Sequence, residues 1–333
     1  MYRTLTLALL LFVLSFGSFA SAAVAAQDAT PSGGAAGPCT APELPPGTPT
    51  PMEAMASPAA MEEMASPEAA DGDAGPPPEA AGAPAGTPVT GADADAAAAG
   101  LENLVNCVNA GDYLATAALM TDNFVANFIG VPTRYDVPAA FEDPEFPVQP
   151  IEIRAIGDVH AYDDGQVSVD WIYAGLFSGP GALSSERWYF MEADGFYTLD
   201  NIMPIPVPEG ALPIATIVEV QMVNYAFALS TNTIPAGPVI FRLANTPDTN
   251  EPHVGVLVTY LEGTTTPQLI EGEVDVLEDS TGFFGAIYLE PGQSGDLVFE
   301  NLEPGTYFLG CDVETADGIP HYLLGMVAEI TVE

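Results

Sequence analysis

The stretch from Glu303 to Met326 reads EPGTYFLGCDVETADGIPHYLLGM. Its Pro304-Gly305 turn signal precedes an aromatic and apolar run over residues 307–309, which predicts a β-strand. The alternating residues from Val327 to Val332 predict the final strand of the chain.

The sequence before this stretch has the same two-residue period. Val218, Val220 and Met222 alternate with Glu219 and Gln221. A second strand is predicted with one apolar face and Arg242 on the other; its apolar face holds Val239, Phe241 and Leu243. About seven such strands separated by turn signals predict an all-β Greek-key sandwich over residues 213–333.

Three segments of this sandwich resemble the cupredoxin family. The hairpin that carries the family's first copper histidine resembles residues 233–245, TIPAGPVIFRLAN, followed by His253. The strand that carries the copper cysteine resembles residues 303–311. The run from His321 to Met326 repeats the family's His-x4-Met ending.

The resemblance implies one type 1 copper ion, with His253, Cys311, His321 and Met326 as its ligands. A thiolate and two neutral imidazoles suit copper in a trigonal plane, and a long axial thioether tunes its reduction potential. The alternative is a degenerate cupredoxin that keeps these four residues for packing. With three histidines in the whole chain, His160 alone is left over, which is too few for a further histidine-rich copper centre.

Two details qualify the resemblance. Asn245 resembles the family's residue that ties the two ligand loops together by hydrogen bonds. Nine residues separate Cys311 from His321, more than in plastocyanin-like and azurin-like proteins and close to the loop of copper nitrite reductases. That loop includes Asp312, Glu314 and Asp317, and one of these carboxylates could compete with Met326 as a ligand.

The preceding half of the chain predicts a separate α+β domain over residues 98–205. Leu101, Leu104, Val105 and Val108 recur at helical spacing. Gly111 is predicted to end that helix, and Asp112 to cap a second one that carries Leu114, Ala118 and Met120. Period-two segments then follow, with turn signals at 163–165 and 193–195.

Two parts of this half resemble the nuclear-transport-factor-2-like (NTF2-like, or SnoaL-like) cone fold. They are the run Val108–Asp122, VNAGDYLATAALMTD, and the closing hairpin from Trp188 to Asp200. That family includes isomerases, polyketide cyclases and pure binding domains. His160, Asp170 and Arg187 are the candidates for a catalytic pocket, and the alternative is that His160 is structural.

The N-terminus predicts a secretory signal peptide over residues 1–26. Arg3 is its one charge, and an apolar run from Leu5 to Phe16 leads to small residues suited to cleavage. The run is short for a bilayer span, and an uncleaved anchor is the alternative.

Residues 27–97 predict a disordered linker, because they are rich in Ala, Pro, Gly and acidic residues and poor in aliphatic and aromatic ones. The linker holds two Met-x-x-Met pairs, Met52/Met55 and Met61/Met64. Thioethers suit Cu(I), and repeat slippage in a low-complexity segment explains the same pattern.

The cysteine count is odd. In an oxidising compartment, a bridge between Cys39 and Cys107 would leave Cys311 free for a metal, although the sequence does not fix that pairing.

The composition is strongly acidic, with 46 acidic residues, five basic ones and a net charge of -41. Such a charge excludes nucleic acid as a partner and disfavours anionic membrane surfaces. It suits solubility in a salty or extracellular medium, or the steering of a basic redox partner.

These observations favour an exported one-electron carrier rather than an enzyme. An apolar patch for docking is expected from Ile319, Pro320, Tyr322, Leu323 and Leu324, unless these residues are buried in the end of the sandwich. The alternatives are a protein that captures or delivers copper with the help of the Met-rich linker, and a metal-free binding module.

Overall fold

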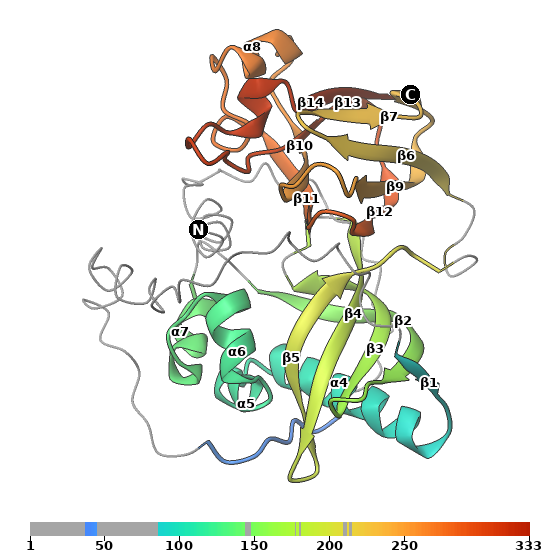
Figure 1. The fold of residues 1–333 in the computed structure, drawn as a ribbon, viewed down its shortest axis with the longest axis vertical. Coiled ribbons are helices and arrows are strands. Elements are labelled where there is room, and N and C mark those ends of the chain that lie inside the picture. Colours follow the sequence, from blue (N-terminus) through green and yellow to red (C-terminus); the bar gives the residue numbers. More distant parts are fainter. Residues whose placement is uncertain are drawn as a thin grey trace, which may run out of the picture.

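The computed structural model describes residues 37–44, 86–143, 148–176, 178–179, 181–208, 212 and 215–333. The predicted signal peptide and both Met-x-x-Met pairs lie outside these residues. The described chain forms an α+β part, followed by a β-sandwich that contains the C-terminus (Figure 1). None of its described helices is long and apolar enough to cross a membrane.

Helix α4 (Ala92–Asn109) confirms the first predicted helix. Leu101, Leu104, Val105 and Val108 are all buried on the face that packs against the sheet.

Gly111 follows this helix with φ of 68°, a conformation that glycine adopts without strain. The side chain of Asp112 then accepts a hydrogen bond from the Ala115 amide and caps α5 (Tyr113–Ala118). Both predicted helix signals are confirmed. The second helix is shorter than predicted, since it ends before Met120.

Short helical turns complete the helical layer beside the sheet. They are α6 (Asp122–Phe124), the π-helical turn η2 (Val125–Ile129), the 3-10 turn η3 (Arg134–Asp136) and α7 (Val137–Phe141).

An antiparallel sheet forms the other layer of the α+β part. Its strands are β1 (Thr87–Val89), β2 (Gln149–Ala161), β3 (Gln166–Leu176), β4 (Ala182–Ala193) and β5 (Phe196–Pro204). The turns predicted at 163–165 and 193–195 connect β2 to β3 and β4 to β5. The helices-then-sheet order is as predicted, while the NTF2-like family stays a prediction.

Part of the predicted disordered linker is ordered. Residues 87–89 pair with β2, and Ala97, within α4, is fully buried. An alanine-rich run lacks bulky apolar side chains, yet alanine has the highest helix propensity of any residue. Asp93 and Asp95 add negative charge to the first turn of α4, where the helix dipole favours it.

A second ordered part of the linker is anchored by the disulfide between Cys39 and Cys107, which settles the pairing that the sequence left open. Beside it, the Thr40 amide donates to Asn103 Oδ1 at 2.9 Å, and Asn103 Nδ2 donates to the Thr40 carbonyl at 2.6 Å. Cys311 is the free cysteine, and it is buried.

Replacing Cys39 and Cys107 together by serine is expected to lower the free energy of unfolding by about 2 kcal/mol. Chain entropy sets an upper figure of about 4 kcal/mol for the separation of 68 residues. The expected loss is smaller than this upper figure because the segment around Cys39, once released, also gains conformational entropy in the folded state. Urea denaturation of the full chain measures the change. Thr40→Ala, which keeps the disulfide, is the control. An unchanged free energy in the double variant would contradict the anchoring role.

The C-terminal part is a sandwich of two sheets, as predicted. One layer contains β6 (Thr216–Val223), β7 (Ala226–Leu229), β9 (Gly237–Asn245) and β12 (Ser294–Leu302). The other contains β8 (Thr233–Ile234), β10 (His253–Thr259), β11 (Gly282–Leu289), β13 (Gly305–Gly310) and β14 (Val327–Val332). The chain crosses between layers from β9 to β10 and from β12 to β13, as in Greek-key sandwiches.

The predicted alternation places the core between these layers. Val239, Phe241 and Leu243 of β9 are fully buried in one apolar cluster, which also contains Cys311 and Met326. Arg242 lies on the opposite face of β9. Two short helical elements, α8 (Thr266–Ile270) and η4 (His321–Leu324), lie close together beside the sandwich.

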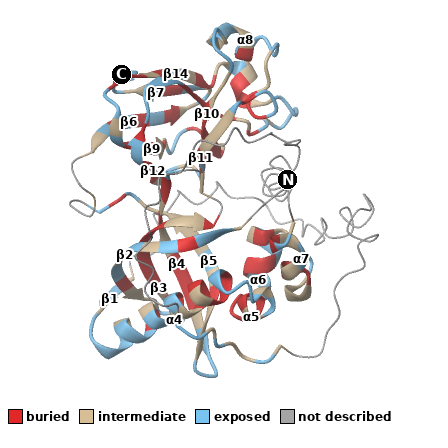
Figure 2. Cartoon of the chain, turned by 180° about the vertical axis from the view of Figure 1, so that it is seen from behind, coloured by how far each residue is buried: buried red, intermediate tan, exposed pale blue. Residues whose placement is uncertain are grey.

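The two parts share one sheet, which the sequence did not predict. Strands β4 and β12 pair antiparallel, with Leu183 opposite Val298 and Ala182 opposite Phe299. A small apolar cluster spans the junction, and buried residues continue across it (Figure 2). Its buried members are Ile172, Leu183, Val207, Ile240 and Val298.

Candidate metal centre

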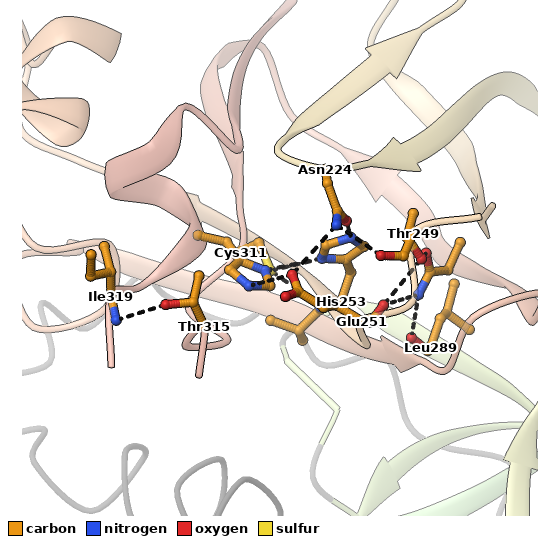
Figure 3. Close-up of polar contacts among 11 residues, drawn as sticks. Asn224, Thr249, Glu251, His253, Leu289, Cys311, Thr315 and Ile319 are labelled. Atoms are coloured by element: carbon orange, nitrogen blue, oxygen red, sulfur yellow. Dashed lines mark hydrogen bonds and ion pairs between the residues drawn. The ribbon is translucent and has the colours of Figure 1, made fainter. Parts of the chain in front are cut away.

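Three predicted ligands meet inside the sandwich. His253 and His321 place their Nδ1 atoms 3.1 Å apart. Cys311 Sγ lies 3.9 Å from His253 Nδ1 and 3.5 Å from His321 Nδ1 (Figure 3). All three residues are completely buried. Within the described chain, this is the one group of histidine, cysteine and acidic side chains close enough to hold a metal ion.

Regular elements position each of these side chains. His253 begins β10, Cys311 directly follows β13, and His321 begins η4. Because β10 and β13 are paired strands, His253 and Cys311 are brought together although they are far apart in the sequence.

Backbone hydrogen bonds hold the loop between Cys311 and Met326 against the sandwich. The His321 amide donates to the Val313 carbonyl at 2.8 Å, and the Tyr322 amide donates to the Cys311 carbonyl at 2.8 Å. The Cys311 amide donates to the Met326 carbonyl at 3.1 Å. These bonds fix the backbone at the three predicted ligands of this loop, Cys311, His321 and Met326.

Met326 is buried in the same apolar cluster as Cys311. Its amide donates to the His321 carbonyl at 3.0 Å, so its backbone lies beside the ligand loop. Its role as an axial ligand stays a prediction. Of the competing carboxylates, Glu314 and Asp317 are exposed, and burial raises the pKa of Asp312 to about 6.

Burial determines the protonation of the site. It lowers the pKa of both His253 and His321 to about 4, so both imidazoles are neutral at pH 7, as metal binding requires. Burial also raises the pKa of the Cys311 thiol, and the backbone amides of Val254 and Val313 oppose this effect by hydrogen bonding to sulfur. A metal ion would have to displace the thiol proton.

Asn245 supports the site differently from its predicted role. Its Nδ2 donates to the carbonyls of Glu251 and Leu289, both at 2.9 Å, and its Oδ1 accepts from the Thr249 hydroxyl at 2.9 Å. These bonds fix the loop before His253 against the end of β11. They do not join that loop to the loop of Cys311 and His321.

The sequence analysis missed three residues that contact the histidines. Asn224 Oδ1 lies 2.8 Å from His253 Nε2, and Glu251 Oε2 lies 3.5 Å from His321 Nε2. The ring of Tyr225 packs on His321 with centroids 4.7 Å apart. Glu251 stands two residues before His253, which is a local signal. Asn224 and Tyr225 come from the β6–β7 turn, far from both histidines in the sequence.

The donor set fits a first-row transition metal. Typical metal bonds are about 2.0 Å to imidazole nitrogen and about 2.3 Å to thiolate sulfur. Two nitrogens bound to the same ion can therefore lie at most about 4.0 Å apart, and a nitrogen and a sulfur at most about 4.3 Å apart. The observed separations of 3.1, 3.5 and 3.9 Å are shorter than these limits, so one ion can contact all three atoms. A Cys-His-His set with a nearby methionine is the donor set that suits copper in a trigonal site.

Two of the three candidates in the α+β part pair with each other. Arg187 binds Asp170 through two hydrogen bonds of 2.6 and 2.8 Å, so the two charges neutralise each other across β3 and β4. His160 lies on β2, beside the edge strand β1. The cavity between the helices and the sheet measures about 20 Å³, room for about one water molecule.

No family model matches the chain, and no curated protein matches it. Among solved structures, auracyanin B is 24% identical over 36% of this chain and 89% of its own, with a TM-score of 0.25. Reduced auracyanin from Roseiflexus castenholzii is 25% identical over 36% of this chain and 99% of its own, with a TM-score of 0.26. Copper nitrite reductase from Nitrosomonas europaea is 19% identical over 36% of this chain and 41% of its own, with a TM-score of 0.21. Because these TM-scores are low, the function is inferred from the residues of the site.

Proposed function

We propose that this chain is an exported copper protein that carries one electron at a time on a single type 1 copper ion. One observation carries the proposal: two neutral imidazole nitrogens and one thiol sulfur converge within 3.9 Å of one another in a fully buried place. In the metal-free protein these atoms contact one another, and a shared metal ion would replace those contacts with three bonds to one cation.

The chain's own residues favour electron transfer over metal-centred chemistry on a substrate. Copper bound here would supply one-electron exchange between Cu(I) and Cu(II). Paired strands and backbone hydrogen bonds fix the ligands, so their positions need to change little when the charge changes. His253 and His321 are fully buried, which leaves no open position for a substrate.

Export and a basic partner belong to the same proposal. The disulfide between Cys39 and Cys107 suits an oxidising compartment. Ile319 and Leu324 are 42% exposed beside His321, whereas Tyr322 is buried. The net charge of -41 would attract a positively charged redox partner to such a surface.

The test is a Cu(II) titration of the mature protein, followed by optical and EPR spectroscopy. We expect one equivalent of copper, an intense thiolate-to-copper band, narrow hyperfine splitting and reversible reduction. A protein that stays colourless would overturn the proposal. Readily exchanged Cu(I) without reversible redox cycling would instead favour copper capture or delivery.

A further inference from the structure

The far nitrogens of the two histidines belong to one chain of polar groups. His253 Nε2 lies 2.8 Å from Asn224 Oδ1. Asn224 Nδ2 lies 3.5 Å from Glu251 Oε2, and the same oxygen lies 3.5 Å from His321 Nε2. These contacts are made at the Nε2 atoms, whereas the Nδ1 atoms of both rings face Cys311 Sγ.

The orientation of the Asn224 amide decides which nitrogen of His253 carries the proton. Asn224 Nδ2 donates to the Thr249 carbonyl at 2.8 Å, so its Oδ1 must be the atom that faces His253. An amide oxygen can only accept, so His253 must donate from Nε2. Its Nδ1 then holds a lone pair directed at Cys311 and His321.

Glu251 lies beside His321 without a hydrogen bond to it. Its carboxylate is 33% exposed, and the distance of 3.5 Å to His321 Nε2 is longer than a good hydrogen bond. Within the described chain, His321 Nε2 makes no hydrogen bond, whereas its Nδ1 lies 3.1 Å from His253 Nδ1 and can donate to the lone pair there. The carboxylate therefore acts on His321 through its charge. The ring of Tyr225 packs on His321 with centroids 4.7 Å apart and helps to hold that imidazole in place.

We propose that Asn224 and Glu251 are positioning residues of this site: Asn224 fixes His253 with its Nδ1 free, and the charge of Glu251 favours the oxidised metal ion. The first half concerns the metal-free protein. The second half rests on the proposed function, because an additional negative charge near Cu(II) stabilises it more than Cu(I).

The first experiment measures imidazole nitrogen NMR shifts of the metal-free full chain. The wild type should show His253 as one tautomer, protonated on Nε2, and Asn224→Ala should show a mixture. The control is Asn232→Ala, at an exposed asparagine in the turn before β8, and it should match the wild type. An unchanged His253 tautomer in Asn224→Ala would overturn this half of the proposal.

The second experiment measures the Cu(I) and Cu(II) affinities of Glu251→Gln. The glutamine keeps the size of the side chain and removes its charge. The ratio of Cu(I) to Cu(II) affinity should rise about tenfold, as expected for groups that contact metal ligands. Glu262→Gln, at an exposed glutamate after β10, should leave the ratio unchanged.

The outcomes separate this inference from the proposed function. If Glu251→Gln binds copper with the wild-type ratio, the role of Glu251 is wrong while the copper site stands. If the wild type itself binds no copper, the proposed function and the redox half both fail, and the NMR experiment still decides the role of Asn224.

Discussion

Replacing Cys311 by serine should abolish the thiolate-to-copper band and weaken copper binding by more than about a hundredfold, the upper range for losing residues around a metal ligand. Serine keeps the position and nearly the size of the side chain, but its hydroxyl is neutral and hard, whereas the thiolate is soft and charged. The Val254 amide, which donates to Cys311 Sγ at 3.4 Å, can donate to the serine oxygen instead. The fold should therefore survive the change.

The measurement is a competition titration with a copper chelator, together with optical spectra and far-UV circular dichroism. His160→Gln is the matched control, because it removes the third histidine of the chain, which lies on β2 away from the cluster. It should bind copper as the wild type does. A Cys311→Ser variant that keeps wild-type affinity would show that copper binds elsewhere in the chain.

The candidate ligands could be predicted because they stand in or beside a single recognisable stretch. Cys311, His321 and Met326 lie within 16 residues, and their order relative to the last two strands resembles a known pattern. His253 begins a strand that pairs with β13, so one strand pairing brings it to the cluster. The structure brings the three predicted histidine and cysteine ligands together.

The residues behind the histidines could not be predicted in the same way. Asn224 reaches His253 from a turn 29 residues earlier, and a turn asparagine is common for purely local reasons. Its contact depends on how far the β6–β7 hairpin extends over the end of the sandwich. Side-chain period and composition do not contain that information.

The shared sheet was also beyond the sequence analysis. The pairing of β4 with β5 begins at Glu186, so the first residues of β4 are left open, and β12 pairs with Ala182 and Leu183 there. That this short open end meets an open strand of the sandwich cannot be read from either strand alone. At this junction, Ile172, Leu183, Ile240 and Val298 are buried in one apolar cluster. The α+β part and the sandwich therefore meet through buried residues as well as through the segment that connects them.

Asp296→Ala should lower the free energy of unfolding of the full chain by about 3 kcal/mol, the lower part of the range for breaking a buried ion pair. Asp296 has a fully buried side chain on β12 and accepts from Arg242 Nε at 3.2 Å and Nη2 at 3.0 Å. It also accepts from the Val207 amide at 2.8 Å, so one carboxylate holds the segment that connects the two parts. The lower value is expected because the Arg242 side chain is 31% exposed and can be hydrated when its partner is lost.

Urea denaturation measures the loss, and hydrogen exchange at the Val207 amide shows whether the connecting segment is released. The control is Glu219→Ala, which removes a carboxylate opposite Arg242 on β6 and should change the free energy by less than about 0.5 kcal/mol, as for exposed pairs. Copper binding should be unaffected, because Asp296 lies on the face of β12 opposite the core that contains Cys311. A loss below about 1 kcal/mol, the size of one ordinary hydrogen bond, with Val207 still protected, would show that apolar contacts alone hold the two parts together.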